Sequence, residues 1–125
     1  MKGQRLFVRP IDAEDAVAVA DFLARHGIAA PTTPSCGLVG KLVGDLVAVL
    51  TMEVTETAIR VEDLIVAEEL RGKRVGRVMM NELDALAAKM DRNRIEAGRG
   101  GADGFLRRVG FEEEGTKWVR RVSRR

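Results

Sequence analysis

The residues best suited to chemistry lie between Arg71 and Arg77, after an apolar run that ends at Val66. Gly72 and Gly76 fall where an expected strand turns into an expected helix, so the backbone can approach a ligand closely there. The unpaired amides of a helix's first turn, together with the helix dipole, favour anions. Four of the seven residues in this stretch are basic. The stretch predicts a phosphate-binding loop, with a solvated basic turn as the alternative.

The spacing in this loop differs from two common phosphate-binding motifs. A P-loop has Ser or Thr after its GK pair, whereas Gly72 and Lys73 are followed by Arg74, so the hydroxyl that would hold magnesium is missing. The GxGxxG spacing of dinucleotide-binding folds is absent as well. Neither motif therefore explains the loop.

Two blocks of the sequence carry a family resemblance. Arg71–Gly76 resembles the acetyl-CoA signature of the GNAT N-acetyltransferase superfamily, Q/R-x-x-G-x-G/A, with Arg74 in place of the middle glycine. Ala102 to Phe111 is similar to the family's A-x-x-F-Y-x-x-x-G-F, with Leu106 in the tyrosine position. With the opening strand and helix, the resemblance covers nearly the whole chain.

The resemblance implies an acyltransferase that moves an acetyl group from acetyl-CoA to a primary amine by direct attack. Proximity alone can lower such a barrier by ~7–11 kcal/mol. The loop would hold the pyrophosphate, and the strand before it would pair with the pantetheine arm as with an added strand. We expect the Arg74 side chain to pair with a phosphate, although a positive φ there would crowd the turn. The residues assigned to the cofactor are Leu64, Ile65, Val66, Arg71, Gly72, Lys73, Arg74, Val75, Gly76 and Arg77.

The proton chemistry rests on fewer residues. The family often uses a tyrosine as general acid, and this sequence contains none. Related enzymes place a glutamate or a bound water on either of two strands, which makes Glu62 and Glu96 the candidate bases. Strand alternation puts Glu62 on one face with Arg60, Leu64 and Val66. Either carboxylate could instead be solvated or ion-paired, and the whole chain could be a non-catalytic CoA-binding or regulatory module.

Periodicity and turn residues predict the elements around these sites. Asp12 and Asp15 form a capping-box pattern before the first helix, and Gly44-Asp45 is expected to form a hairpin turn. The element order β-α-β-β-β-α-β-α-β-β predicts an α/β (α+β) fold, a mixed, mostly antiparallel central sheet flanked by helices, as in the GNAT family. The expected strands are Arg5–Arg9, Gly37–Val43, Asp45–Val54, Ala58–Val66, Arg94–Ala97, Phe111–Glu114 and Lys117–Val122, and the expected helices are Asp12–His26, Val75–Met90 and Ala102–Val109.

Composition sets the broad class of the protein. A chain of 125 residues, 46% of them hydrophobic, predicts one globular domain over residues 1–125. The formal charge of +2 does not demand a nucleic-acid partner. The single cysteine, Cys36, excludes an internal disulfide and fits a reducing compartment. The sequence shows no signal-peptide pattern, no apolar run of about 18 residues and no indicated metal site, so we expect a cytoplasmic protein without a membrane partner.

Two questions stay open at this point. Pro31 and Pro34 make Ile28–Ser35 a loop, with little room for the substrate-contacting helix that many family members carry. The acceptor site is then either open or completed by a second subunit, so a homodimer is possible, and Trp118 is either core or interface. The acceptor is a small-molecule or peptide amine, with polyamines, amino acids, aminoglycosides and protein lysines all remaining candidates.

Overall fold

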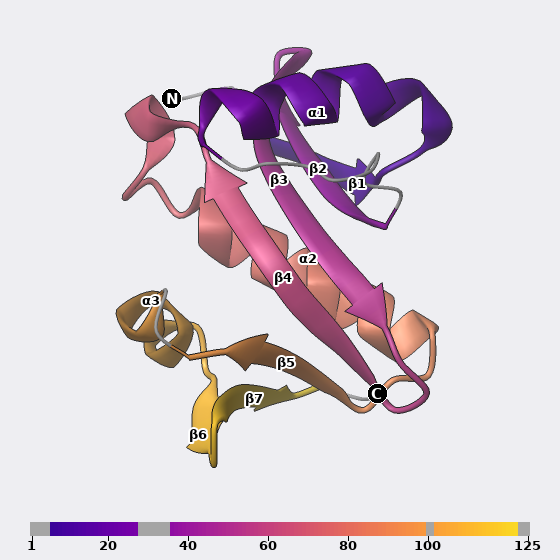
Figure 1. The fold of residues 1–125 in the computed structure, drawn as a ribbon, viewed down its shortest axis with the longest axis vertical. Coiled ribbons are helices and arrows are strands. Elements are labelled where there is room, and N and C mark those ends of the chain that lie inside the picture. Colours follow the sequence, from indigo (N-terminus) through magenta and orange to yellow (C-terminus); the bar gives the residue numbers. More distant parts are fainter. Residues whose placement is uncertain (1–5, 28–35, 100–101, 123–125) are drawn as a thin grey trace. The chain divides into compact units, whose positions relative to one another are not determined.

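The structure, a computed structural model, describes residues 6–27, 36–99 and 102–122 (Figure 1). The predicted loop Ile28–Ser35 lies outside these residues. Two 3₁₀ turns, η1 (Ala13–Asp15) and η2 (Glu68–Leu70), accompany the longer elements. Those elements are β1 (Leu6–Pro10), α1 (Ala16–Arg25), β2 (Gly37–Leu42), β3 (Asp45–Val54), β4 (Ala58–Val66), α2 (Val75–Lys89), β5 (Arg94–Gly98), α3 (Asp103–Arg108), β6 (Glu112–Glu114) and β7 (Lys117–Arg121).

The strands form one seven-stranded sheet in the order β1-β2-β3-β4-β5-β7-β6. β4 and β5 run parallel, whereas β1–β2, β2–β3, β5–β7 and β6–β7 are antiparallel pairs. The predicted fold class and element order are therefore confirmed. The boundaries differ by at most one residue, except that the helix expected from Asp12 begins as the 3₁₀ turn η1 and becomes α-helical only at Ala16. β7 has a neighbour on each side, so the strand that begins at Lys117 is not a sheet edge.

The chain packs into two compact units that interleave along the sequence. Unit 1 comprises Met1–Thr51 and Asp63–Met79, and unit 2 comprises Met52–Glu62 and Met80–Arg125. β3, β4 and α2 each pass from one unit into the other. That the chain is a single domain stays a prediction.

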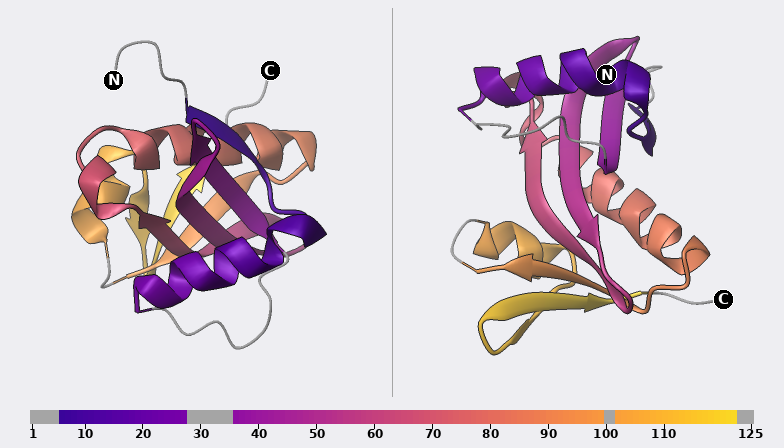
Figure 2. Two further views of the ribbon diagram at one scale, coloured as in Figure 1. Left: turned by 90° about the horizontal axis from the view of Figure 1, so that it is seen from above. Right: turned by 45° about the vertical axis from the view of Figure 1, so that its right-hand side comes forward.

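In unit 1, α1 lies against one face of the strands (Figure 2). The predicted capping box is present: Asp12 accepts a hydrogen bond from the Glu14 N–H, and Asp15 accepts one from the Asp12 N–H. The guanidinium of Arg9 on β1 donates to both carboxylate oxygens of Asp15, at 2.7 and 2.8 Å. These bonds, with that from Asp12, hold the pKa of the buried Asp15 well below its usual range. The pair fixes the start of α1 to the sheet.

In unit 2, Trp118 and Arg120 of β7 contact α3 and the part of α2 that belongs to this unit. Trp118 is 1% exposed and its indole N–H donates to Asp103 of α3 at 2.9 Å, so it is core. Arg120 donates to the Val109 carbonyl at 3.1 Å. It also lies 3.5 Å from the Asp84 carboxylate of α2. Arg120 therefore joins three elements of this unit.

The β2–β3 hairpin turns one residue earlier than predicted. Val43 and Gly44 occupy the turn, with φ of 52° and 84°, whereas Asp45 already belongs to β3. Two consecutive positive φ values are what a two-residue hairpin turn of type I′ requires. The prediction of Gly44-Asp45 was wrong because a β-branched residue such as Val43 is disfavoured at positive φ, and nothing in the local sequence signals the exception.

Candidate cofactor site

β4 extends further than its pairing with β5. The parallel register runs from Ala58 opposite Arg94 to Val61 opposite Ala97, and it stops there. β4 itself continues to Val66. Beyond Val61, the backbone groups on the β5 side of β4 are therefore not paired with β5.

Two hydrogen bonds show which backbone groups of this segment face β3. The Asp63 N–H donates to the Thr51 hydroxyl at 3.1 Å, and the Ala67 N–H donates to the Val47 carbonyl at 2.8 Å. Because successive residues of a strand direct their N–H and C=O groups to opposite sides, Ile65 also faces β3.

By the same alternation, Leu64 and Val66 direct their backbone groups away from β3, where an added strand could pair with them. The Val66 carbonyl already accepts a hydrogen bond from the Arg71 guanidinium at 3.3 Å, and it has a second lone pair. Of the three strand residues assigned to the cofactor, Ile65 could contribute only its side chain. The assignment of all three stays a prediction.

β4 carries one residue more than β3 over the length that they share. Thr55 pairs with Ala58 at the turn between them, and Val47 pairs with Ala67 at the other end. This leaves eight steps along β3 against nine along β4, which is a β-bulge. Alternation predicts that Glu62, Leu64 and Val66 share one face of the sheet. An extra residue interrupts that alternation, so the prediction no longer follows from it.

The loop that follows β4 leads directly into α2. The Lys73 N–H donates to the Leu70 carbonyl at 3.2 Å, which closes the turn after η2. The Val78 N–H donates to the Arg74 carbonyl at 3.0 Å, so Arg74 provides the first carbonyl of α2. The amides of residues 75–77 thus lie in the first turn, where no carbonyl of the helix precedes them. Sequence reasoning placed this helix start correctly.

Arg74 adopts a left-handed backbone conformation, with φ of 68°, and Gly72 has φ of 81°. A non-glycine residue there costs roughly 1–2 kcal/mol. The middle glycine of the family signature thus corresponds to a position that favours glycine on backbone grounds, and this chain accepts the strain. The flexibility of Gly72 and Gly76 does not relieve it, because the positive φ is at Arg74 itself.

The loop concentrates positive charge without internal neutralisation. All four of its basic side chains are exposed, and none forms an ion pair with a carboxylate within the described residues. A cation that is not paired within the chain remains available to an external anion. The four residues are Arg71, Lys73, Arg74 and Arg77.

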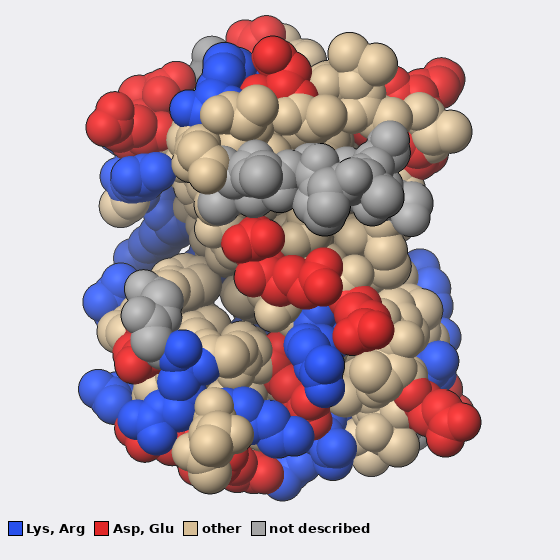
Figure 3. All heavy atoms as spheres, in the orientation of Figure 1, with Lys and Arg blue, Asp and Glu red and all other residues tan. Residues whose placement is uncertain are grey.

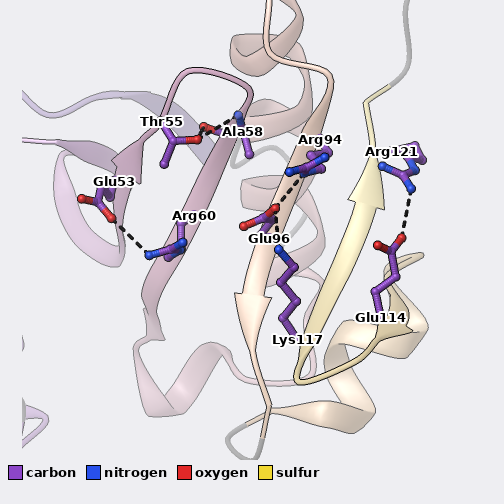
Figure 4. A network of polar contacts seen from close by, with 9 residues as sticks. All are labelled: Glu53, Thr55, Ala58, Arg60, Arg94, Glu96, Glu114, Lys117 and Arg121. Atoms are coloured by element: carbon purple, nitrogen blue, oxygen red, sulfur yellow. Dashed lines mark hydrogen bonds and ion pairs between the residues drawn. The ribbon is translucent and has the colours of Figure 1, made fainter.

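The two candidate bases lie in very different environments, both in unit 2. Glu62 is exposed, and no hydrogen bond or ion pair of its side chain occurs within the part of the chain that the structure describes. Glu96 is 4% exposed and accepts hydrogen bonds from Arg94 at 2.7 Å and from Lys117 at 3.0 Å (Figure 4). Burial alone would raise the pKa of Glu96, but the bonds from Lys117 and Arg94 outweigh it and lower the pKa.

Sequence reasoning missed the partners of Glu96. Arg94 is two residues away on the same strand, which a period-two pattern could have indicated. Lys117 lies on β7, and only the pairing of Gly98 with Lys117 in the sheet brings it close. The position that matches the family's tyrosine, Leu106, is buried at 5% exposure.

Within the described ranges, no group of three or more potential ligand side chains is arranged to hold a metal ion. No described helix is long and apolar enough to cross a membrane.

The sequence of residues 33–113 matches the family model described as an acetyltransferase (GNAT) domain, which is more than half of the chain. The chain belongs to the GNAT acetyltransferase family. The resemblance carried by the Arg71–Gly76 and Ala102–Phe111 blocks is thereby confirmed. No curated protein sequence matches the chain.

Solved structures share the fold at low sequence identity. N-acetylglutamate synthase from Neisseria gonorrhoeae, complexed with coenzyme A and N-acetyl-glutamate, is 13% identical with a TM-score of 0.82 over 96% of this chain. This chain spans only 36% of that synthase. The GNAT family N-acetyltransferase YhbS from Escherichia coli, in complex with CoA, is 16% identical with a TM-score of 0.73, covering 98% of this chain and 84% of its own.

A third neighbour is the ribosomal-protein-S18-alanine N-acetyltransferase from Escherichia coli, 12% identical with a TM-score of 0.78. The alignment covers 95% of both chains. At these sequence identities the likeness concerns the fold alone. The acceptors of the three proteins are not carried over to this chain.

Proposed function

We propose that the protein is an N-acetyltransferase that transfers an acetyl group from acetyl-CoA to a primary amine by direct attack. The observation that carries the proposal is the end of β4, which extends past its pairing with β5 and leads into a basic loop at the start of α2. The cations of this loop form no ion pair among the described residues. Family membership and CoA in two of the structural neighbours support the same cofactor.

The cofactor would use the two parts of this region differently. The amides of residues 75–77 and the cations of the loop would bind the pyrophosphate, since both present positive charge that no carboxylate of the described residues neutralises. The backbone groups of Leu64 and Val66 would pair with the pantetheine amides as an added strand does. The first interaction depends on charge, whereas the second depends on the direction of backbone groups.

We assign the general base to Glu62, directly or through a water that it orders, rather than to Glu96. A base must be free to take a proton. Arg94 and Lys117 both donate to Oε2 of Glu96, and the lowered pKa of this carboxylate makes it a weaker base. Glu62 is exposed, and it is the first residue of β4 beyond the last pair with β5.

One observation favours the alternative function, a CoA-binding or regulatory module without catalysis. The sequence contains no tyrosine, and buried Leu106 cannot donate a proton to the leaving thiolate. As an enzyme, the protein would leave that protonation to water. We therefore expect it to be slow for its family.

Two measurements test the function. Acetyl-CoA at millimolar concentration should raise the melting temperature, because it binds only the native state. A mass-spectrometric screen of pooled amines, from polyamines and amino acids to lysine peptides, should then show an acetylated product. If acetyl-CoA binds but no acetylated product forms, the non-catalytic CoA-binding module is favoured. If acetyl-CoA does not raise the melting temperature, both the enzyme and the CoA-binding module are rejected.

The assembly is a separate proposal. A homodimer would complete an open acceptor site, and light scattering at high protein concentration measures it. Because β6 pairs with Lys117–Val119, a dimer that added a strand along the whole of β7 would have to displace β6. A monomeric mass would count against the dimer and would leave the proposed chemistry intact.

A further inference from the structure

Thr51 on β3 is a buried polar residue to which the proposed chemistry gives no role. It is 7% exposed, and its hydroxyl oxygen accepts the Asp63 N–H at 3.1 Å. In a regular antiparallel ladder such an N–H donates to a carbonyl of the neighbouring strand. A side-chain acceptor at this point therefore marks an irregular ladder.

The hydrogen bond lies within the stretch of β4 that contains the extra residue, between Ala58 and Ala67. From Asp63 to Ala67 the N–H groups alternate regularly, since both of these residues donate toward β3. The Thr51 hydroxyl thus holds β4 at the point where regular alternation resumes. A shift of β4 by one residue would turn toward β3 the backbone groups that now face away from it, and the reverse.

We infer that Thr51 is a positioning residue for the pantetheine arm of the cofactor. By accepting the Asp63 N–H, it acts with the Ala67–Val47 hydrogen bond to direct the backbone groups of Leu64 and Val66 away from β3, where the arm would pair with them. The inference rests on the proposed function, because it concerns how the same cofactor is held. Thr51, Asp63 and the loop Arg71–Arg77 all belong to unit 1.

The inference separates the two halves of CoA. The loop binds phosphates through amides and cations that form no hydrogen bond with Thr51, so a change at Thr51 should affect only the pantetheine half. A residue that merely stabilises the fold would weaken both halves together. The fragment 3′-phospho-ADP contains the phosphates of CoA without its pantetheine arm, so it reports on the loop alone.

The test compares Thr51→Val with Thr51→Ser by isothermal titration against CoA and against 3′-phospho-ADP. Valine keeps the branched shape and removes the acceptor, whereas serine keeps the acceptor. In Thr51→Val, the Kd for CoA should rise by about tenfold, the effect of losing about one hydrogen bond between the arm and the misplaced backbone of Leu64 and Val66. The Kd for 3′-phospho-ADP should stay unchanged, and Thr51→Ser should bind both ligands as the wild type does.

Equal weakening of both ligands, or unchanged CoA affinity in folded Thr51→Val, would overturn the inference. If Thr51→Val does not fold, Thr51→Cys replaces it, because sulfur is a weak acceptor of similar size, and the same pair of affinities decides. Wild-type protein that binds neither ligand would reject the proposed function instead. Wild-type binding without a selective loss in the variant would reject only the role of Thr51.

Discussion

Two charged regions of the protein, one in each unit, treat their charges in opposite ways. In unit 1, the four cations of the loop Arg71–Arg77 have no carboxylate partner among the described residues. In unit 2, the sheet face formed by β5, β6 and β7 carries cations that are paired. Arg94 and Lys117 bond Glu96, and Arg121 bonds Glu114. Figure 3 shows basic and acidic side chains interspersed over the part of its view that these strands form.

The difference separates charges that hold the fold from charges that are free to bind a ligand. A carboxylate that accepts hydrogen bonds from two cations is stabilised in its charged form, so taking up a proton costs it more than it costs an unpaired carboxylate. A cation without a carboxylate partner breaks no ion pair when it meets a phosphate. Pairing therefore decides which of several similar charged residues to assign to function, and residue type alone does not.

The largest expected effect is on the rate of acetyl transfer. Glu62→Gln keeps the size of the side chain and loses its basicity, so the rate at neutral pH should fall by about 10²–10⁴ with unchanged CoA affinity. The loss should shrink as pH rises, because the acceptor amine then deprotonates without help. Steady-state rates across pH measure this.

The matched variant is Glu96→Gln. It should keep the rate and instead lower the free energy of unfolding by about 1–3 kcal/mol, since Arg94 and Lys117 lose a charged acceptor. If Glu96→Gln shows the rate loss and Glu62→Gln does not, an ion-paired carboxylate serves catalysis here. That result would contradict the separation of paired, structural charges from unpaired, functional ones. If neither variant is slowed on an authentic acceptor, neither carboxylate is the base.

The next effect is on cofactor binding. In Gly76→Asp, a carboxylate at the second residue of α2 would repel the pyrophosphate, and CoA affinity should fall by at least about a hundredfold, or 2.7 kcal/mol. The fold should survive, because an acidic residue near a helix start is favourable. Gly76→Asn is the neutral control of equal size, and titration with CoA measures both. Equal losses would show that bulk rather than charge is responsible, and undiminished CoA affinity in folded Gly76→Asp would place the phosphate site elsewhere.

A smaller effect tests whether a paired charge, Asp15 with Arg9, stabilises the fold. Asp15→Asn should lower the free energy of unfolding at pH 7 by about 1–3 kcal/mol, because the bonds from Arg9 lose their charge. The folded-state pKa of Asp15 lies below its unfolded value, so this stability is present above about pH 4–5. It is lost as the pH falls toward the folded-state pKa. The difference between wild type and variant in urea unfolding should therefore narrow in acid, and a constant difference would contradict the pairing.

The smallest effect concerns Arg74, where strain and charge oppose each other. Arg74→Gly should stabilise the fold by roughly 0.5–1 kcal/mol, because glycine accepts a positive φ freely. It should also weaken CoA binding by up to about tenfold, or 1.4 kcal/mol, and more at low salt than at high salt. Arg77→Gln is the control for loss of a charge without a change in backbone strain, because Arg77 lies at a helical position. Stabilisation without any loss of affinity would mean that Arg74 does not contact the cofactor.

Local patterns were sufficient to predict the elements and the loop. The helix starting at Val75 and the strand Ala58–Val66 follow from apolar periodicity, and the Asp12–Asp15 capping box follows from residue types three apart. The loop at Arg71–Gly76 needs only a strand, glycines and a helix in succession. All these signals lie within a few residues, where sequence reflects physical constraint most directly.

The missing parts depend on pairings that are distant in sequence. The partners of Glu96 follow from β7 lying between β5 and β6, an order that no local pattern determines. The extra residue in β4 is visible only once Val47 and Thr55 are matched to their partners. The positive φ of Val43 and of Arg74 contradicts the preference of both residue types, so the residues themselves do not signal it. At Arg74 the only signal was the glycine that the family signature has at this position.

The interleaving of the two units has a consequence for the order in which the growing chain can fold. Synthesis completes the sequence of unit 1 at Met79, whereas the rest of unit 2, from Met80 onward, is made after Met52–Glu62. Roughly thirty residues separate Glu62 from Arg94, which corresponds to about 2–6 s at typical elongation rates. During that interval the side of β4 that faces β5 is an uncovered strand edge. It is covered in two stages: by β5 from Ala58 to Val61 once that strand has been made, and beyond Val61, on the function proposed above, by the cofactor.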